Sequence, residues 1–340
     1  MLAVRDKNVI QIEVTNACSN ECTNCSRFVG HYRETYFMPL EQVEKAIDSL
    51  LGFPGGIGIM GGEPLMHPDF PEICLLVKQM VPPEKRYLWT SGYNWNASRR
   101  IIRKTFGENV HFNNHNDTTQ KHHPMLLGIS DVIDDKELIR QLIDDCWVNR
   151  KWSASINPKG CFFCEIAAAM DVLFEGPGGH PVVRGWWNKD PDAYRDQIER
   201  YCYRCGACVP YFPVTLEELD VASTGNYLSL KEVDSPKLRK KGLKLYEEGL
   251  SQQQFEELGP KWQPWDHLGV MSKKGTGENI CDMYGRLYNY LHRIKKSIYS
   301  RSWILRRAGA AVSRGLWRLQ SEWAHCFKTP GVNIVQKSCD

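Results

Sequence analysis

The sequence lacks several features that define whole classes of protein. No apolar run among its 340 residues approaches the ~20 that a membrane-spanning helix needs. The opening stretch, MLAVRDKNVIQIEV, has no hydrophobic segment followed by a small-residue cleavage site. Internal repeats and low-complexity stretches are also missing. These absences predict a globular protein without a transmembrane segment that works in the cytoplasm, or in the host cytoplasm if its source is a virus.

Cysteine, by contrast, is abundant. The chain has 13 cysteines, an odd number, so they cannot all pair within one chain. The cytoplasm keeps thiols reduced, so disulfides are not expected. Eight fall in tight groups, which is typical of metal binding: Cys18, Cys22 and Cys25; Cys161 and Cys164; and Cys202, Cys205 and Cys208. The remaining five stand alone and are expected to be small core residues: Cys74, Cys146, Cys281, Cys326 and Cys339.

The first part of the chain alternates strand and helix patterns. Strands are predicted over 9–15, 56–60, 86–90 and 109–112, and helices over 39–51, 70–81, 98–106 and 136–148. Strands separated by helices predict βαβ units and a parallel sheet. The sequence therefore indicates an α/β protein. We expect a full or partial parallel (β/α) barrel over 1–150, a cysteine-rich extension over 151–212, and a helical region with a basic tail over 213–340.

Two motifs follow neighbouring strands of this predicted sheet. The first is Cys18-x3-Cys22-x2-Cys25, and the second is the turn Gly61-Gly62-Glu63-Pro64. Three thiolates on one short loop can bind three corners of a 4Fe-4S cluster and leave one iron open to a small molecule. Zinc with a missing fourth ligand is the alternative. Loops at the carboxyl ends of parallel strands meet at one edge, so we expect the two motifs to lie together.

The cysteine loop and the Gly-Gly-Glu-Pro turn, in this order and placement, resemble the radical S-adenosylmethionine (SAM) superfamily. The resemblance implies that the open iron binds the methionine part of SAM and that Glu63, within the Gly61–Pro64 turn, contacts its amino group. Ser91, after the third strand, resembles a further SAM contact. The implied reaction is reductive cleavage of SAM to a 5′-deoxyadenosyl radical, with an electron donor such as flavodoxin or ferredoxin.

One residue of the loop departs from the family. Many radical SAM proteins have an aromatic residue directly before the third cysteine, and here that residue is Asn24. The departure affects a familiar contact to adenine rather than the cluster. Phe28 and Tyr32 are the candidates to replace the missing aromatic ring.

The later cysteines resemble a second metal site. The turn Asn157–Gly160, followed by Cys164 and a helical pattern, resembles the SPASM and twitch extensions that hold auxiliary iron–sulfur clusters. That resemblance implies the ligands Cys164, Cys202, Cys205 and Cys208, and leaves the place of Cys161 open. The spacing by itself also allows a zinc ribbon, with Cys161 and Cys164 paired to Cys202 and Cys205.

The basic tail points to a polyanionic partner. Residues 286–319 contain nine Lys or Arg and no Asp or Glu, interleaved with Tyr and Trp. This pattern is typical of nucleic-acid binding, although a membrane surface or a solvated helix would use the same residues. A further resemblance, to radical SAM proteins of bacteriophage DNA-hypermodification systems, suggests an enzyme that rearranges or modifies a base in DNA.

The sequence leaves other functions open. The predicted reaction class is an isomerase or mutase, with an oxidoreductase as the alternative. A peptide-maturing or sugar-modifying radical SAM enzyme would carry the same motifs. A protein of another class, a non-catalytic cysteine-rich module that binds metal and nucleic acid, would use the cysteines and the basic tail without the SAM chemistry.

Overall fold

A computed structural model describes residues 1–113, 121–209, 214–215 and 219–246. The chain divides into two compact units, Met1–Gln263 and Pro264–Asp340, and all described residues belong to the first. The basic segment 286–319 and the cysteines at 281, 326 and 339 lie outside the described residues. None of the helices in the described part is both long and apolar enough to cross a membrane.

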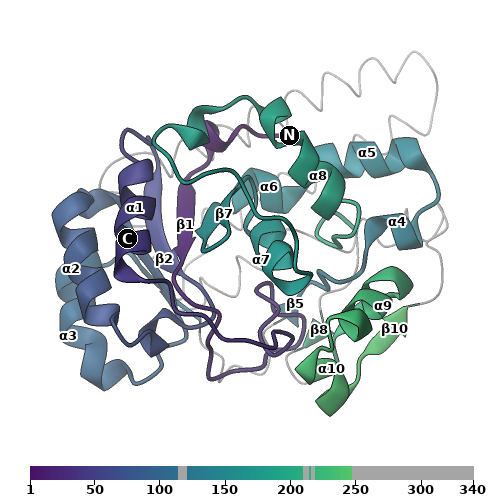
Figure 1. The fold of residues 1–340 in the computed structure, drawn as a ribbon, viewed down its shortest axis with the longest axis horizontal. Coiled ribbons are helices and arrows are strands. Elements are labelled where there is room, and N and C mark those ends of the chain that lie inside the picture. Colours follow the sequence, from purple (N-terminus) through teal and green to yellow (C-terminus); the bar gives the residue numbers. More distant parts are fainter. Residues whose placement is uncertain (114–120, 210–213, 216–218, 247–340) are drawn as a thin grey trace, which may run out of the picture. The chain divides into compact units, whose positions relative to one another are not determined.

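A six-stranded sheet forms the centre, in the order β4-β3-β2-β1-β6-β7 (Figure 1). Its strands are β1 (Val9–Glu13), β2 (Gly56–Met60), β3 (Arg86–Thr90), β4 (Val110–Phe112), β6 (Ala154–Asn157) and β7 (Gly160–Phe162). Neighbouring strands are parallel except in the β6–β7 hairpin. The sheet does not close, and the predicted α/β fold with a partial parallel barrel is confirmed.

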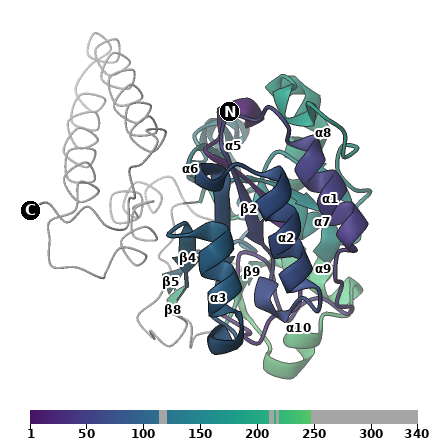
Figure 2. The ribbon, with the colours of Figure 1, turned by 90° about the vertical axis from the view of Figure 1, so that its left-hand side faces the viewer.

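Three helices lie side by side on one face of this sheet (Figures 1 and 2). They are α1 (Leu40–Ser49), α2 (Phe70–Met80) and α3 (Trp95–Phe106), and they connect consecutive parallel strands as the alternating pattern predicted. Ile12 and Ile59 on the strands are fully buried in one core with Val43 of α1 and Ile73 of α2. The apolar stripe of each helix thus covers the apolar side of the strands.

The remaining elements are shorter. The helices are α4 (Ile129–Val132), α5 (Lys136–Asp144), α6 (Trp147–Lys151), α7 (Glu165–Leu173), α8 (Arg195–Tyr201), α9 (Thr224–Glu232) and α10 (Pro236–Lys241). The strands are β5 (Lys121–His122), β8 (Val214–Thr215), β9 (Val221–Ser223) and β10 (Lys244–Tyr246). Short 3-10 helices occupy Val4–Asp6, Pro64–Met66, Pro83–Lys85, Trp186–Asn188 and Pro191–Tyr194.

Residues 219–246 differ from the helical region expected there. They contain the two helices α9 and α10, but also β9 and β10, which pair in parallel. Strands of three residues are too short for an alternating pattern to be visible in the sequence. As shown below, this segment belongs to the same core as the cysteine loop.

Candidate active site

The cysteine loop leaves the carboxyl end of β1 and carries three partly exposed thiols, those of Cys18, Cys22 and Cys25. Burial raises the pKa of Cys18 to about 11 and that of Cys22 to about 12, so both thiols keep their protons at neutral pH unless a metal displaces them. Three soft sulfur ligands on one short loop fit an iron–sulfur cluster.

The turn after β2 lies directly against this loop. Gly62 N donates to Thr15 O at 2.7 Å, and Glu63 N donates to Ala17 O at 2.6 Å. A Cβ on Gly61 would lie 2.1 Å from Thr15 O, and a Cβ on Gly62 would lie 2.3 Å from Ala17 O. Both positions therefore need glycine because a side chain would push the cysteine loop away. The two glycines therefore allow the backbone of the Gly61–Pro64 turn to pack directly against the backbone of the cysteine loop.

The side chain of Glu63 joins this turn to the end of β3. It is fully buried, and its Oε1 accepts hydrogen bonds from Thr90 Oγ1 at 2.6 Å and Leu65 N at 3.0 Å. Its Oε2 accepts from Ser91 N at 2.6 Å and from the Ser91 hydroxyl. The structure thus brings Ser91 to the Gly61–Pro64 turn. It also engages the Glu63 carboxylate with four donors of the protein itself, which the motif alone did not predict.

Glu63→Gln tests this arrangement. The amide nitrogen is a donor, so it would face the N–H and O–H groups that now donate to the carboxylate. We expect the free energy of unfolding to fall by about 2–3 kcal/mol, as when hydrogen bonds to a buried charge are lost. SAM affinity should fall as well, because Ser91 loses its anchor. Denaturant titration and calorimetric SAM titration measure the two effects.

Glu72→Gln provides the matched control, because Glu72 lies exposed on α2. It should leave both quantities within about 0.5 kcal/mol of the parent protein. Equal stability of the two variants would contradict the role assigned to Glu63.

A buried ionic network from residues 219–246 holds the middle of the cysteine loop. Asp220 accepts a hydrogen bond from Asn24 N, and its Oδ2 lies 2.7 Å from Lys237 Nζ and 2.9 Å from His31 Nε2. Lys237 Nζ also donates to Cys22 O at 2.8 Å. The side chains of Asp220, Lys237 and His31 are nearly inaccessible to solvent. A segment about 200 residues further along the chain therefore holds the backbone of the loop in place.

The same network explains why Asn24 replaces an aromatic residue. Its φ of 49° lies in the left-handed region, which asparagine tolerates better than most residues with a side chain. Its Oδ1 accepts from Val221 N at 2.9 Å, a bond that an aromatic ring cannot make. Of the two proposed replacements, Phe28 is buried in the core, and the Tyr32 hydroxyl donates to Ala169 O at 3.3 Å.

Asp220→Asn should damage the cysteine loop selectively. The substitution keeps the shape of the side chain but leaves Lys237 buried without its counter-ion. Breaking a buried ion pair in this way typically costs ~3–5 kcal/mol. We expect a loss of stability of that order and a lower iron content at the Cys18–Cys25 loop, measured by denaturant titration and iron analysis.

The control for this variant is Asp234→Asn. Asp234 forms an exposed ion pair with Arg239 at 3.0 Å, and exposed pairs contribute less than ~1 kcal/mol. A folded Asp220→Asn protein with unchanged iron at the loop would show that the network does not position it.

The face of the sheet opposite α1–α3 carries a buried polar cluster beside the loop. The guanidinium of Arg27 lies 2.6 Å from Gln11 Oε1, 3.1 Å from Glu165 Oε2 and 3.7 Å from Glu13 Oε1. All four residues are less than 5% exposed. Burial raises the pKa of Glu13, and the positive charge of Arg27 opposes that rise. The cluster forms a polar, water-poor wall close to the thiols.

Aromatic rings continue this face across β3 and β4. Trp89 and His111 stack with ring centroids 4.5 Å apart, and Tyr87 stacks on His111 at 6.0 Å. A Cβ on Gly56 would lie 2.4 Å from the Tyr87 ring, and one on Gly58 would lie 2.5 Å from the Trp89 ring. The glycines of β2 therefore give the rings room to lean across the sheet. Burial lowers the pKa of His111 to about 4, so its ring is neutral at physiological pH.

These rings were not predicted to belong to a site. The signal was present in the strand pattern RYLWT, because residues two apart in a strand point to the same face. The same alternation places Gln11 and Glu13 of β1 on one face. Without the order of the strands, however, the sequence did not show that these faces meet.

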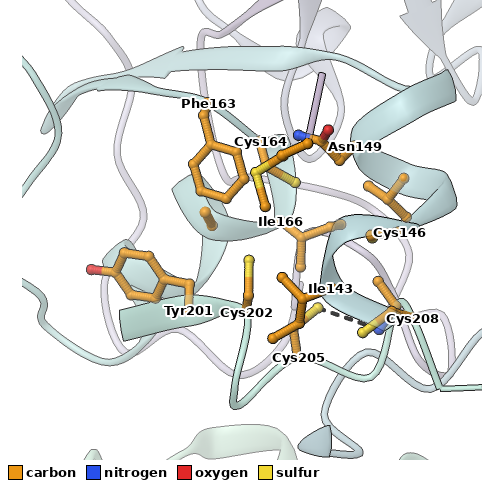
Figure 3. A pocket seen from close by; sticks show the side chains of 14 residues that line it. Ile143, Cys146, Asn149, Phe163, Cys164, Ile166, Tyr201, Cys202, Cys205 and Cys208 are labelled. Atoms are coloured by element: carbon orange, nitrogen blue, oxygen red, sulfur yellow. Dashed lines mark hydrogen bonds between the residues drawn. The ribbon is translucent and has the colours of Figure 1, made fainter. Parts of the chain in front are cut away.

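The second cysteine group lines a buried pocket between helices (Figure 3). Its lining includes the four thiols expected to act together, those of Cys164, Cys202, Cys205 and Cys208. Cys164 directly precedes α7, and the other three follow the end of α8. Cys161 is not part of this lining, since its Sγ lies 3.7 Å from Pro181 O beside β7. The structure thus separates Cys161 from the rest.

Cys146 is the fifth thiol of the pocket and was expected to be an ordinary core residue. It lies in the turn between α5 and α6, where the single helix predicted over 136–148 is broken. A hydrogen bond with Cys208 lowers the pKa of Cys146 to about 7. Lys7 lies nearby and is buried, which lowers its pKa, while the surrounding thiols and Glu165 oppose that change.

The chemistry of the pocket fits a cluster of several atoms. Among the described residues, no three His, Cys, Asp or Glu side chains converge closely enough to hold one metal ion. Five cysteines, three of them buried and two partly buried, nevertheless surround a single pocket. A 4Fe-4S cube takes one thiolate at each of its four corners, so its ligands lie around the group rather than on one point.

Comparison with known proteins shows which protein family part of the chain matches. Residues 12–105 match the family model described as "Radical SAM superfamily", a segment that contains the cysteine loop, the Gly61–Pro64 turn and Ser91. Over these residues the chain matches the radical SAM superfamily, which supports the predicted radical SAM enzyme. That family implies a 4Fe-4S cluster and SAM. No curated protein matches the chain.

One solved structure that is similar is described as "Crystal structure of BtrN in complex with AdoMet and 2-DOIA". It is 15% identical, and the match covers 58% of this chain and 92% of that chain with a TM-score of 0.38.

Proposed function

We propose that Cys18, Cys22 and Cys25 hold the 4Fe-4S cluster and that the Gly61–Pro64 turn and Ser91 form the SAM site. The observation that carries this proposal is the direct contact between the loop and the turn, with Glu63 extending it to Ser91. When bound, the cluster and SAM supply one-electron chemistry that begins with removal of a hydrogen atom from a substrate.

The chain's own residues hold and shield this site. The glycines and the Asp220 network determine the path of the cysteine loop, and Glu63 determines the position of Ser91. The Arg27 cluster buries its charges beside the loop and leaves little room for water. Exclusion of water protects a reactive site from side reactions.

The proposed substrate is a base in DNA, which the enzyme rearranges or modifies. The stacked rings of Tyr87, Trp89 and His111 support it, because aromatic faces bind the planar faces of bases. A neutral His111 adds a donor and an acceptor without a charge. Membership of the radical SAM superfamily favours an enzyme over a non-catalytic nucleic-acid-binding module.

The second part of the proposal is an auxiliary 4Fe-4S cluster in the Figure 3 pocket, held by four of its five thiols. The alternative is a zinc ion in place of this cluster, and metal analysis distinguishes the two. Clusters of this kind fit a cytoplasmic enzyme that receives electrons from flavodoxin or ferredoxin. The cytoplasm also keeps the thiols available for metal.

Mass spectrometry of products tests the substrate. DNA is incubated with SAM and anaerobically reconstituted, dithionite-reduced protein and is then digested to nucleosides. We expect a nucleoside of changed mass in the digest. The same treatment with the Cys18→Ala/Cys22→Ala/Cys25→Ala variant should not. Changes confined to peptides or to sugars would replace DNA by the peptide-maturing or sugar-modifying alternative.

A further inference from the structure

The exposed face of α3 is strongly and uniformly basic. In twelve residues the helix carries four cations and no acid, and all four cations are exposed: Arg99, Arg100, Arg103 and Lys104. Arg99 and Arg103 are four residues apart, as are Arg100 and Lys104, so they form two adjacent rows on the outer surface. In the described part of the chain, none of the four makes an ion pair.

Helix α10 is equally basic, but its four cations all form ion pairs, with Asp220, Asp234 or Glu21, unlike those of α3. The neighbouring helices of the same layer are not basic: α1 has three acids and one lysine, and α2 has one of each. Of the six exposed arginines elsewhere in the described residues, five form an ion pair, as in Arg140 with Glu137 and Arg195 with Asp192. A solvated helix face would not need to concentrate cations and leave each without an ion pair among the described residues. The arrangement fits a ligand with several negative charges.

Exposed aromatic rings stand at the beginning of the same helix. Tyr93 is 43% exposed and Phe112 is 51% exposed, and Trp95 packs edge-on against Phe112 at 6.2 Å. Phe112 rests on Gly92, where a Cβ would lie 2.3 Å from the ring. This contact fixes the ring at the carboxyl end of β4. Tyr93 is two residues beyond Ser91, so the rings lie on the same edge of the sheet as the proposed SAM site.

We propose that this surface binds a single-stranded segment of nucleic acid. The phosphates lie along the two rows of cations on α3, and bases stack on Tyr93 and Phe112 (Figure 2 shows α3 at the end of the helical layer). Cations that track the backbone beside aromatic rings that accept any base are the two parts of a single-strand binding site. The inference deepens the proposed function, since it leads a strand toward the edge where Ser91 lies.

Binding is measured by fluorescence anisotropy with the full chain, reconstituted without oxygen, and a labelled 20-nucleotide DNA of mixed sequence. The test variant replaces Arg99, Arg100, Arg103 and Lys104 by Gln. The control replaces four exposed cations of α5 and α8 by Gln, namely Lys136, Arg140, Arg195 and Arg200, and so has the same net charge.

We expect the α3 variant to bind at least about 10-fold more weakly, and the control to bind almost as the parent does. The dependence of log affinity on log salt should flatten by roughly 0.7 for each lost phosphate contact, or about 2–3 in total. Tyr93→Ala and Phe112→Ala should each weaken binding about 5-fold or more with little change in the salt slope, because stacking is not ionic. Leu75→Ala, an exposed apolar residue of α2, is their control.

Equal losses in the α3 variant and its charge-matched control would overturn the proposal. Unchanged DNA binding by the α3 variant would also overturn the proposal. The same holds if this variant loses binding to phosphatidylserine vesicles but not to DNA. Failure of the proposed function has a different signature. A parent protein that binds DNA through α3 but forms no 5′-deoxyadenosine from SAM would refute the proposed chemistry and leave this binding surface intact.

Discussion

The Cys18→Ala/Cys22→Ala/Cys25→Ala variant should form no 5′-deoxyadenosine from SAM under reducing conditions. Its three thiols are the only ligands proposed for the cluster that binds SAM, and without them neither iron nor SAM is held at the loop. Total iron should fall from about eight atoms per chain to about four, because the second set is untouched. Chromatography of the nucleoside product and colorimetric iron analysis measure these outcomes.

Cys74→Ala is the control for this experiment. Cys74 is fully buried in the core of α2, away from both cysteine groups, so it removes a thiol without removing a proposed ligand. It should keep all of the iron and all of the 5′-deoxyadenosine formation. Undiminished product in the triple variant would refute the assignment of the loop.

The second large effect is expected at Cys164. Cys164→Ala removes a thiol from the Figure 3 pocket, so the protein should lose about four of its eight irons. The free energy of unfolding should also fall, since metal bound only by the folded chain stabilises it. Iron and zinc analysis, combined with denaturant titration, measures both changes.

Cys161→Ala is its matched control, because Cys161 lies only three residues earlier but outside the pocket. It should retain the metal. Retention of iron in Cys164→Ala and its loss in Cys161→Ala would transfer the ligand to Cys161. One tightly held zinc and no residual iron in protein purified without oxygen would refute the auxiliary cluster.

The fifth thiol gives a finer result. Four thiolates suffice for one cube, so one of the five pocket cysteines should be replaceable without loss of iron. Cys146 and Cys208 are the pair to compare, because a hydrogen bond joins their side chains. Retention of iron in one of the two single alanine variants, and its loss in the other, identifies the ligand.

The sequence by itself determined the architecture of the first 112 residues and the placement of two motifs within it. Strands β1 to β4 and helices α1 to α3 follow from local periodicity, which depends only on neighbouring residues. Because parallel strands end at a common edge, the Cys18–Cys25 loop and the Gly61–Pro64 turn had to lie close together. The spacing of these motifs was enough to indicate the radical SAM class.

Only the tertiary structure decided how the site is built. Asp220 and Asn24 are 196 residues apart, and their local patterns do not indicate that they meet. Cys146 lines the pocket of the second cysteine group because helix α5 ends earlier than the periodicity predicted. Cys161 lies outside this pocket because its thiol, on β7, points toward Pro181. Contacts between distant segments depend on how whole elements pack. Local sequence patterns predict which face of an element is apolar. They do not predict which polar side chain of a distant segment will form a hydrogen bond with that element.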